Sequence, residues 1–128
     1  MRLLLDTHVL IWFGTGDTRL PPSARRAITD APSGVFVSAA SAWEIATKAR
    51  IGKLPPGPLA TAFIETVRAE GFRILSVGAQ DAQDAGNLPG PHGDPFDRML
   101  VAQALRRDLA VISNDAVLDQ FGVTRLWA

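Results

Sequence analysis

Four acidic residues stand at points in the chain where a carboxylate could do chemistry. Asp6 ends an apolar run, Asp115 follows another such run by three residues, and Glu44 and Asp97 lie in the first turns of predicted helices. Two carboxylates about 4 Å apart repel by about 4 kcal/mol at an effective dielectric constant of about 20, so a cluster of four needs protons or a divalent metal ion. Mg²⁺ and Mn²⁺ prefer oxygen ligands and activate water for attack on a phosphate. The four acids therefore indicate hydrolysis of a phosphodiester.

The elements that must position these acids alternate between strand and helix. Runs of leucine, β-branched and aromatic residues predict five strands, at residues 3–5, 35–37, 72–77, 109–112 and 123–127. The first run has no polar position, which is typical of a strand buried on both faces in the middle of a sheet. Alternation of strands and helices implies a largely parallel sheet that is covered on both sides. The predicted fold class is α/β, in a single domain that spans residues 1–128.

Apolar spacing and capping residues predict the helices between these strands. Thr7 is the predicted cap of a short helix that stops at Gly14, and either Ser38 or Ser41 caps the helix that contains Glu44. In open α/β sheets the functional crevice lies beyond the carboxyl ends of the strands, where strands one and four would bring their acids to one rim. The remaining predicted helices span residues 22–30, 59–71, 79–87, 94–104 and 116–120.

Each acid also has a purely structural interpretation. Asp94 and Asp97 are three residues apart at a helix start, where Asp94 is the predicted N-cap and Asp97 would be favoured by the helix dipole. Asp115 could cap the helix at residues 116–120, and Glu44 could be a solvated acid on the face opposite Trp43. Asp6 is the hardest to interpret in this way, since a carboxylate beside a central strand needs a partner or a cation.

Composition excludes several other kinds of site. The chain has 128 residues, no cysteine and two histidines, so disulfides, thiol catalysis and cysteine zinc sites are excluded. Thirteen basic and thirteen acidic side chains give a formal net charge of zero, which favours no class of partner. Apolar runs fall far short of the roughly 20 residues that cross a bilayer, and residues 1–15 lack the features of a signal peptide. We therefore expect a soluble, cytoplasmic protein that contacts no membrane.

Four segments together resemble the signature regions of PIN-domain ribonucleases, and most of all the VapC toxins of bacterial type II toxin–antitoxin modules. The resemblance covers essentially the whole chain in order and spacing. It implies a three-layer α/β/α sandwich with a five-stranded parallel sheet, an acidic site that holds Mg²⁺ or Mn²⁺, and endonucleolytic cleavage of RNA. The segments are Leu3–His8, Ser38–Ile45, His92–Ala104 and Ile112–Asp115.

The resemblance also assigns roles to individual residues. By position, Asp6, Glu44, Asp97 and Asp115 match the catalytic and metal-binding acidic tetrad. Two hydroxyl positions beside that tetrad are matched by Thr7 and by Ser113, where many relatives carry threonine. We interpret His8 as an ordinary helix-start residue and His92 as a solvated loop residue.

Bulky apolar residues near the early helices suggest a protein partner. The resemblance implies a VapB-type antitoxin that lays an apolar segment on these helices, a toxin homodimer, and a higher toxin–antitoxin assembly. The alternative is a domain of the same fold that binds RNA or a protein without cleaving it, although the presence of all four acids argues against this. The apolar residues are Trp12, Phe13, Trp43, Ile51 and Leu54.

Overall fold

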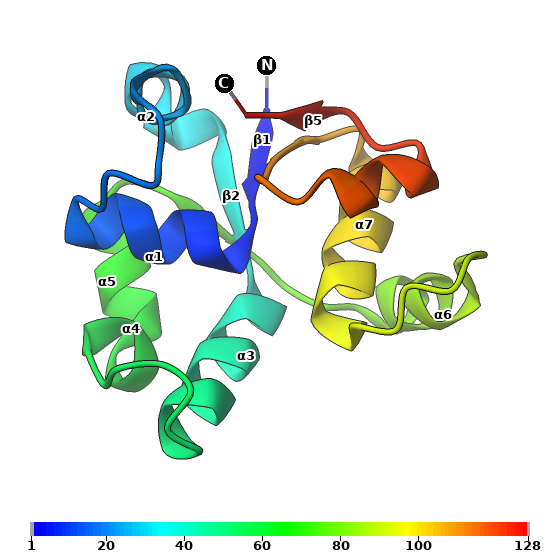
Figure 1. Cartoon of the computed structure of the whole chain (residues 1–128), viewed down its shortest axis with the longest axis horizontal. Helices are drawn as coiled ribbons and strands as arrows, with labels where there is room; N and C mark the ends of the chain where they lie inside the picture. Colours follow the sequence, from blue (N-terminus) through cyan, green and yellow to red (C-terminus); the bar gives the residue numbers. More distant parts are fainter. Residues whose placement is uncertain (1, 128) are drawn as a thin grey trace.

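The computed structural model describes residues 2–127 and contains a five-stranded sheet (Figure 1). The strand bounds are Leu3–Leu5 (β1), Val35–Ser38 (β2), Arg73–Leu75 (β3), Ala110–Ile112 (β4) and Arg125–Leu126 (β5). All pairs are parallel, in the order β3-β2-β1-β4-β5, with Leu3 opposite both Val35 and Ala110. The chain thus builds outward on one side of β1 and later returns to its other side. This order creates a switch point at the carboxyl ends of β1 and β4, where such sheets bind ligands.

The predicted sheet is confirmed, including the central position of the first strand. The third and fifth strands are shorter than predicted, with three and two residues at residues 73–75 and 125–126. Both are edge strands, which pair on one side only, so fewer hydrogen bonds hold their ends in the extended conformation.

Helices cover both faces of the sheet (Figure 1). Their bounds are Thr7–Thr15 (α1), Pro22–Asp30 (α2), Ala39–Arg50 (α3), Pro58–Thr61 (α4), Phe63–Ala69 (α5), Ala79–Asn87 (α6) and Pro95–Arg107 (α7), with 3-10 turns at Pro32–Gly34 (η1) and Ala116–Phe121 (η2). Residues of α1, α2 and α5 pack on one face, those of α7 and η2 pack on the other, and α6 packs on α7. The predicted α/β/α sandwich is confirmed. Among residues 2–127, no helix has both the length and the apolar character needed to span a membrane.

The leucines of β1 tie the two layers together. Successive strand residues point to opposite faces, so Leu3 and Leu5 join the core beneath α1 and α2, whereas Leu4 joins the core beneath α7. All three are buried, and each such burial contributes about 2 kcal/mol. The end of β1, and with it Asp6, is therefore held firmly from both sides.

One aromatic residue that we assigned to the apolar surface lies in the core. Trp12 is 7% exposed because it lies on the inner face of α1, so its predicted exposure is wrong. Phe13 and Leu54 are half-buried and pack against the same core. Trp43 and Ile51 are exposed, as expected for a surface that could receive a partner.

The helix that follows β1 begins one residue earlier than predicted. Asp6, with extended backbone, is the N-cap of α1, so the prediction of Thr7 as the cap is wrong. Thr7 is the first helical residue, and its hydroxyl bonds instead to the hydroxyl of Ser41 over 2.9 Å. Ser38 is the N-cap of α3 and accepts the backbone N–H of Ala40 over 3.0 Å. The two hydroxyls at residues 7 and 41 therefore join α1 to α3.

The predicted helix at residues 59–71 is two helices. The backbone breaks at Ala62, with φ −140° and ψ 52°, between α4 and α5. Leu59 and Phe63 nevertheless pack against the same core, so one apolar stripe serves both helices. Apolar spacing reports the buried face and not the continuity of the backbone, which is why the break was missed. Gly71, with φ +84°, follows the end of α5.

A buried carboxylate fixes α6 against α7. Asp81 is 1% exposed and accepts two hydrogen bonds from the Arg107 guanidinium, 2.9 and 3.0 Å long. The backbone N–H of Gly78 donates a third, over 3.0 Å. The hydrogen bonds and charge of Arg107 lower the pKa of Asp81 to about 2. This contact holds the helix that carries Asp97 in its first turn.

We expect Asp81→Asn to lower the free energy of unfolding by about 2 kcal/mol at neutral pH, because it leaves Arg107 without its charged partner. A lowered carboxylate pKa stabilises the folded state above the unfolded-state value of 3.8, and this contribution is lost as pH falls toward 2. The difference between wild type and variant, measured by urea unfolding, should therefore shrink between pH 4 and pH 2. Asp84→Asn, at a more exposed position on the same helix, should change stability by less than about 0.5 kcal/mol. A full-sized effect persisting at pH 2 would contradict this account of Asp81.

Candidate active site

A polar pocket lies where β1 and β4 end. Its volume is about 510 Å³, and all four predicted acids line it. They come from four separate parts of the chain: the end of β1, α3, the first turn of α7 and the turn after β4. The lining residues are Asp6, His8, Trp12, Arg19, Glu44, Lys48, Asp94, Asp97, Asn114 and Asp115.

Asp6 is the most constrained of the four acids. One carboxylate oxygen accepts the backbone N–H of His8 over 3.2 Å, and the other accepts the hydroxyl of Ser113 over 2.6 Å. Burial raises the pKa of Asp6 above its ordinary value, although both hydrogen bonds act in the opposite direction. The same Ser113 oxygen accepts the backbone N–H of Asp115 over 3.1 Å. Ser113 thus connects two of the acids, as its predicted place beside the tetrad suggested.

Glu44 is paired with a lysine one helical turn further on. It is 4% exposed, so its interpretation as a solvated acid is wrong, whereas its neighbour Trp43 points outward. Lys48 Nζ lies 2.5 Å from Glu44 Oε2. Burial alone would lower the pKa of Lys48, but the hydrogen bond and charge of Glu44 outweigh burial and raise it. Lys48 was not among the predicted site residues, although the four-residue spacing on one helix was a signal that could have found it.

Asp97 is paired with a histidine of the preceding loop. His92 Nε2 lies 2.9 Å from Asp97 Oδ2, so the interpretation of His92 as merely solvated is wrong. Burial raises the pKa of Asp97 to about 6, and the nearby carboxylates of Asp94 and Asp6 add to the effect, while His92 opposes it. The shift has the sign expected for an acid that shares a pocket with other acids.

The two remaining acids of the pocket also cap helices. Asp94 accepts the backbone N–H groups of Phe96 and Asp97 over 2.9 and 3.2 Å, which confirms it as the N-cap of α7. Asp115 accepts the N–H of Val117 over 3.1 Å and caps η2, as its structural interpretation proposed. Capping does not remove Asp115 from the pocket, because its side chain lines the cavity as well.

Arg19 is a further pocket residue that sequence reasoning missed. Its guanidinium lies 4.9 Å from the centre of the Trp12 ring and forms an ion pair with Asp17 of 2.7 Å. Arg19 comes from the loop between α1 and α2, where no periodic pattern predicts side-chain direction. His8, an exposed residue, also lines the pocket.

The chemistry of the pocket suits a hard divalent cation, since its donors are carboxylate oxygens, and burial together with the charges of Asp94 and Asp6 raises the pKa of Asp97. Within residues 2–127, no three Asp, Glu or His side chains are grouped closely enough to enclose an ion as they stand. Glu44 is engaged by Lys48 and Asp97 by His92. Each pair engages one carboxylate oxygen, Glu44 Oε2 and Asp97 Oδ2, so a metal ion would have to share these carboxylates with Lys48 and His92 or displace them.

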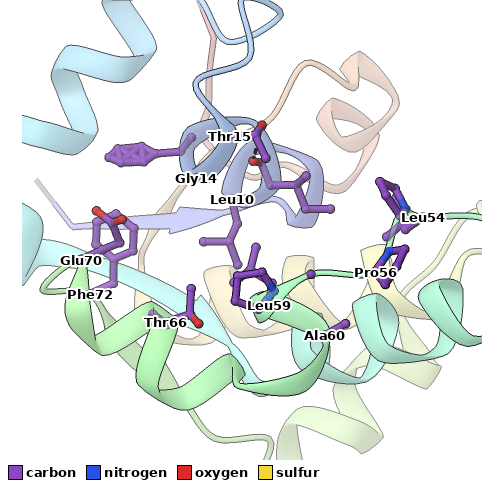
Figure 2. Close-up of a pocket in the computed structure, with 16 residues that line it drawn as sticks. Leu10, Gly14, Thr15, Leu54, Pro56, Leu59, Ala60, Thr66, Glu70 and Phe72 are labelled. Carbon is purple, nitrogen blue, oxygen red and sulfur yellow. Dashed lines mark hydrogen bonds between the residues drawn. The ribbon is translucent and has the colours of Figure 1, made fainter.

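A second, apolar groove lies between α1 and the segment that leads through α4 to α5. Its volume is about 360 Å³. Figure 2 shows Leu10 above Leu59, with Leu54 and Pro56 at one end and Phe72 toward the other. The groove therefore places a continuous apolar surface beside the helix that Asp6 caps.

Comparison with known proteins identifies relatives along nearly the whole chain. The sequence model of the PIN domain matches residues 3–123. Ribonuclease VapC22 of Mycobacterium tuberculosis is 29% identical over 114 residues, which cover 88% of this chain and 86% of that protein. The fold is similar to DNA-bound VapBC from Salmonella typhimurium, with a TM-score of 0.74 and 20% identity over 98% of this chain and 97% of that one. It is also similar to FitAcB from Neisseria gonorrhoeae, with a TM-score of 0.65 and 20% identity over 97% of this chain and 96% of that one.

Because burial raises the pKa of Asp6, its charged form costs free energy in the metal-free protein. We expect Asp6→Asn to stabilise the metal-free protein by about 1 kcal/mol and to raise its Tm by about 4 °C in chelator. Millimolar Mg²⁺ or Mn²⁺ should raise the Tm of wild type, as any ligand of the folded state does, and raise that of Asp6→Asn less.

The matched control is Asp30→Asn at the end of α2, outside the pocket, which should keep the full response to metal. Ionic strength is held constant so that screening is not mistaken for binding. A variant that melts below wild type in chelator and gains as much from metal would show that Asp6 is not part of a cation site.

Proposed function

Because the chain belongs to the PIN domain family, we propose that it is a metal-dependent endoribonuclease that hydrolyses RNA phosphodiester bonds. The observation that carries this proposal is the convergence of Asp6, Glu44, Asp97 and Asp115 on one pocket from four separate elements. The similarity to Ribonuclease VapC22 supports RNA as the substrate. The catalytic domain would comprise residues 1–128.

Asp6, Glu44, Asp97 and Asp115 would hold Mg²⁺ or Mn²⁺. The bound ion would supply a water of lowered pKa and would offset negative charge on the scissile phosphate. Ser113 favours the ionised form of Asp6 and orients it, since its hydroxyl donates to one carboxylate oxygen. Thr7 supports the site less directly, by joining α1 to α3 through Ser41.

Lys48 and His92 would be partners that the carboxylates of Glu44 and Asp97 give up when they bind a cation. Each is within hydrogen-bond distance of one acid of the pocket, Lys48 of Glu44 and His92 of Asp97. If these carboxylates turned to a cation, the Lys48 ammonium and the His92 ring would become available beside the site to donate hydrogen bonds to phosphate oxygens of RNA. The pocket thus contains the groups needed to hold both a cation and a polyanion.

We further propose that the chain is the toxin of a type II toxin–antitoxin pair, acts in the cytoplasm, and is inhibited by a VapB-type antitoxin. Support comes from the solved relatives, which include VapBC and a toxin-antitoxin complex from Klebsiella pneumoniae. The apolar groove beside α1 offers a surface for an apolar segment of such a partner (Figure 2). A homodimer and a larger toxin–antitoxin assembly belong to the same proposal, and light scattering of the free and co-purified protein tests both.

The alternative function is a domain of the same fold that binds RNA or protein without cleaving it. Loss of one or more acids would favour that alternative, and this chain keeps all four in one pocket. We therefore prefer the catalytic function.

Asp97→Asn should remain folded and lose at least about 100-fold in kcat/KM for cleavage of single-stranded RNA, because it removes a carboxylate that would hold the metal. Asp94→Asn is the matched control three residues away and should retain activity within about threefold, since asparagine caps a helix about as well as aspartate. Circular dichroism confirms folding of both. If Asp94→Asn abolished cleavage and Asp97→Asn did not, Asp94 would be the ligand and Asp97 would not.

Gly14 offers a probe of the apolar groove, because a Cβ atom added there meets no heavy atom within 4 Å and the residue lines the groove. Gly14→Glu should place a charge on the surface that the antitoxin covers and weaken inhibition by the co-expressed antitoxin at least about tenfold, because the charge would be desolvated. The RNase activity of the free protein should be unchanged. Gly14→Ala is the control and should be inhibited like wild type. Equal inhibition of all three proteins would place the antitoxin elsewhere.

A further inference from the structure

An exposed tryptophan packs against a half-buried phenylalanine beside the acidic pocket. Trp43 is 66% exposed, although its chain neighbour Glu44 is buried in the pocket. The Trp43 ring meets the ring of Phe96 edge to face, with centroids 5.0 Å apart and planes at 70°. Phe96 in turn precedes Asp97. The pair therefore joins the two helices that each supply one acid, α3 and α7.

The pair borders a hollow that differs in character from the acidic pocket. This hollow has a volume of about 470 Å³ and lies between α3, α6 and α7. Small residues, Ala39, Ala40, Ala82, Ala85 and Gly86, leave room in front of the aromatic rings. An exposed tryptophan beside an open apolar hollow is an apolar surface of the kind that marks a binding site.

Lys48 connects the aromatic pair to the acids. Its Nζ lies 6.0 Å from the centre of the Phe96 ring and 2.5 Å from Glu44 Oε2. A nucleotide whose phosphate lies among the acids would thus have a cation beside its backbone and a flat aromatic surface within the reach of its base. Arg98, which also lines the hollow, is not available for such a ligand, because its guanidinium donates to the backbone carbonyls of Ala85, Leu88 and His92.

We propose that Trp43 and Phe96 form a stacking platform for one unpaired base of single-stranded RNA, adjacent to the phosphate that the acidic pocket receives. Proteins recognise single-stranded RNA largely by stacking its splayed bases on aromatic rings, with cations along the backbone. Lys48 lies near both the Phe96 ring and Glu44 of the acidic pocket, which favours a nucleotide, with its phosphate and its base, over other occupants of this hollow. The inference rests on the proposed ribonuclease function and assigns to that site a base-binding position.

The test measures binding, so that it does not depend on catalysis. Single-stranded RNA of about ten nucleotides is titrated into the protein, a length in the range that single-strand binding sites cover. Calcium replaces magnesium to suppress cleavage, and a gel verifies that the RNA is intact. Trp43→Ala should raise Kd about tenfold, as expected for the loss of one base–aromatic stack, and Trp43→Phe should restore most of the affinity. Ile64→Ala removes another exposed apolar side chain, 51% exposed, from α5 and should leave Kd unchanged.

A second set of RNAs, each lacking one base, identifies the stacked nucleotide. For wild type, loss of that one base should raise Kd about tenfold, whereas for Trp43→Ala the same loss should have little further effect. The two changes then share one interaction, which a general effect of Trp43 on folding would not produce. Additive losses at every position would overturn the platform.

The possible failures are distinguishable. If wild type does not bind single-stranded RNA at all, the proposed ribonuclease function fails along with the platform. If wild type binds and Trp43→Ala binds equally well, only the platform fails. If Trp43→Ala binds RNA normally but changes the mass measured by light scattering, the aromatic pair is a contact between two copies of this chain and the platform is wrong.

Discussion

A carboxylate at the end of a buried central strand must be hydrogen-bonded or neutralised, because an isolated buried charge costs several kcal/mol. Asp6 meets this requirement through Ser113, whose hydroxyl donates to it over 2.6 Å. The contact is possible because β4 lies directly beside β1, with Leu5 opposite Ile112. The residues that follow these two strands therefore leave the sheet side by side. Ser113 also accepts the N–H of Asp115. The order of the strands therefore places Asp6 and Asp115 close together.

The other two acids lie on helices, and each is paired with a side chain nearby. Glu44 is held by Lys48 from the same helix, and Asp97 by His92 from the loop before α7. The Lys48 ammonium thus offsets part of the negative charge of the pocket from within. A cation that drew these carboxylate oxygens away would leave Lys48 and His92 without their present partners beside the site.

Local patterns predict the fold well, because strands, caps and apolar faces depend on neighbouring residues. The leucines before Asp6 predict the central strand, and Asp94 followed by proline predicts the start of α7. Contacts between segments are harder to predict from the sequence. The pairing of His92 with Asp97 depends on the path of an irregular loop that no periodicity describes. Thr7 was misassigned as a cap because helix propensity does not reveal where a strand stops. The sequence resemblance identifies the four acids but not the partners that hold them.

Analysis of the RNA ends produced by the purified protein separates metal-assisted hydrolysis from cleavage by the RNA's own 2′-hydroxyl. Water activated by a metal ion attacks phosphorus directly, so the 2′-hydroxyl takes no part in the reaction. The carboxylate pocket predicts cleavage that needs Mg²⁺ or Mn²⁺, stops in chelator, leaves no 2′,3′-cyclic phosphate, and continues when the scissile nucleotide is 2′-deoxy. Cleavage that persists in chelator, or cyclic phosphate ends, would contradict a metal-binding role for the four acids.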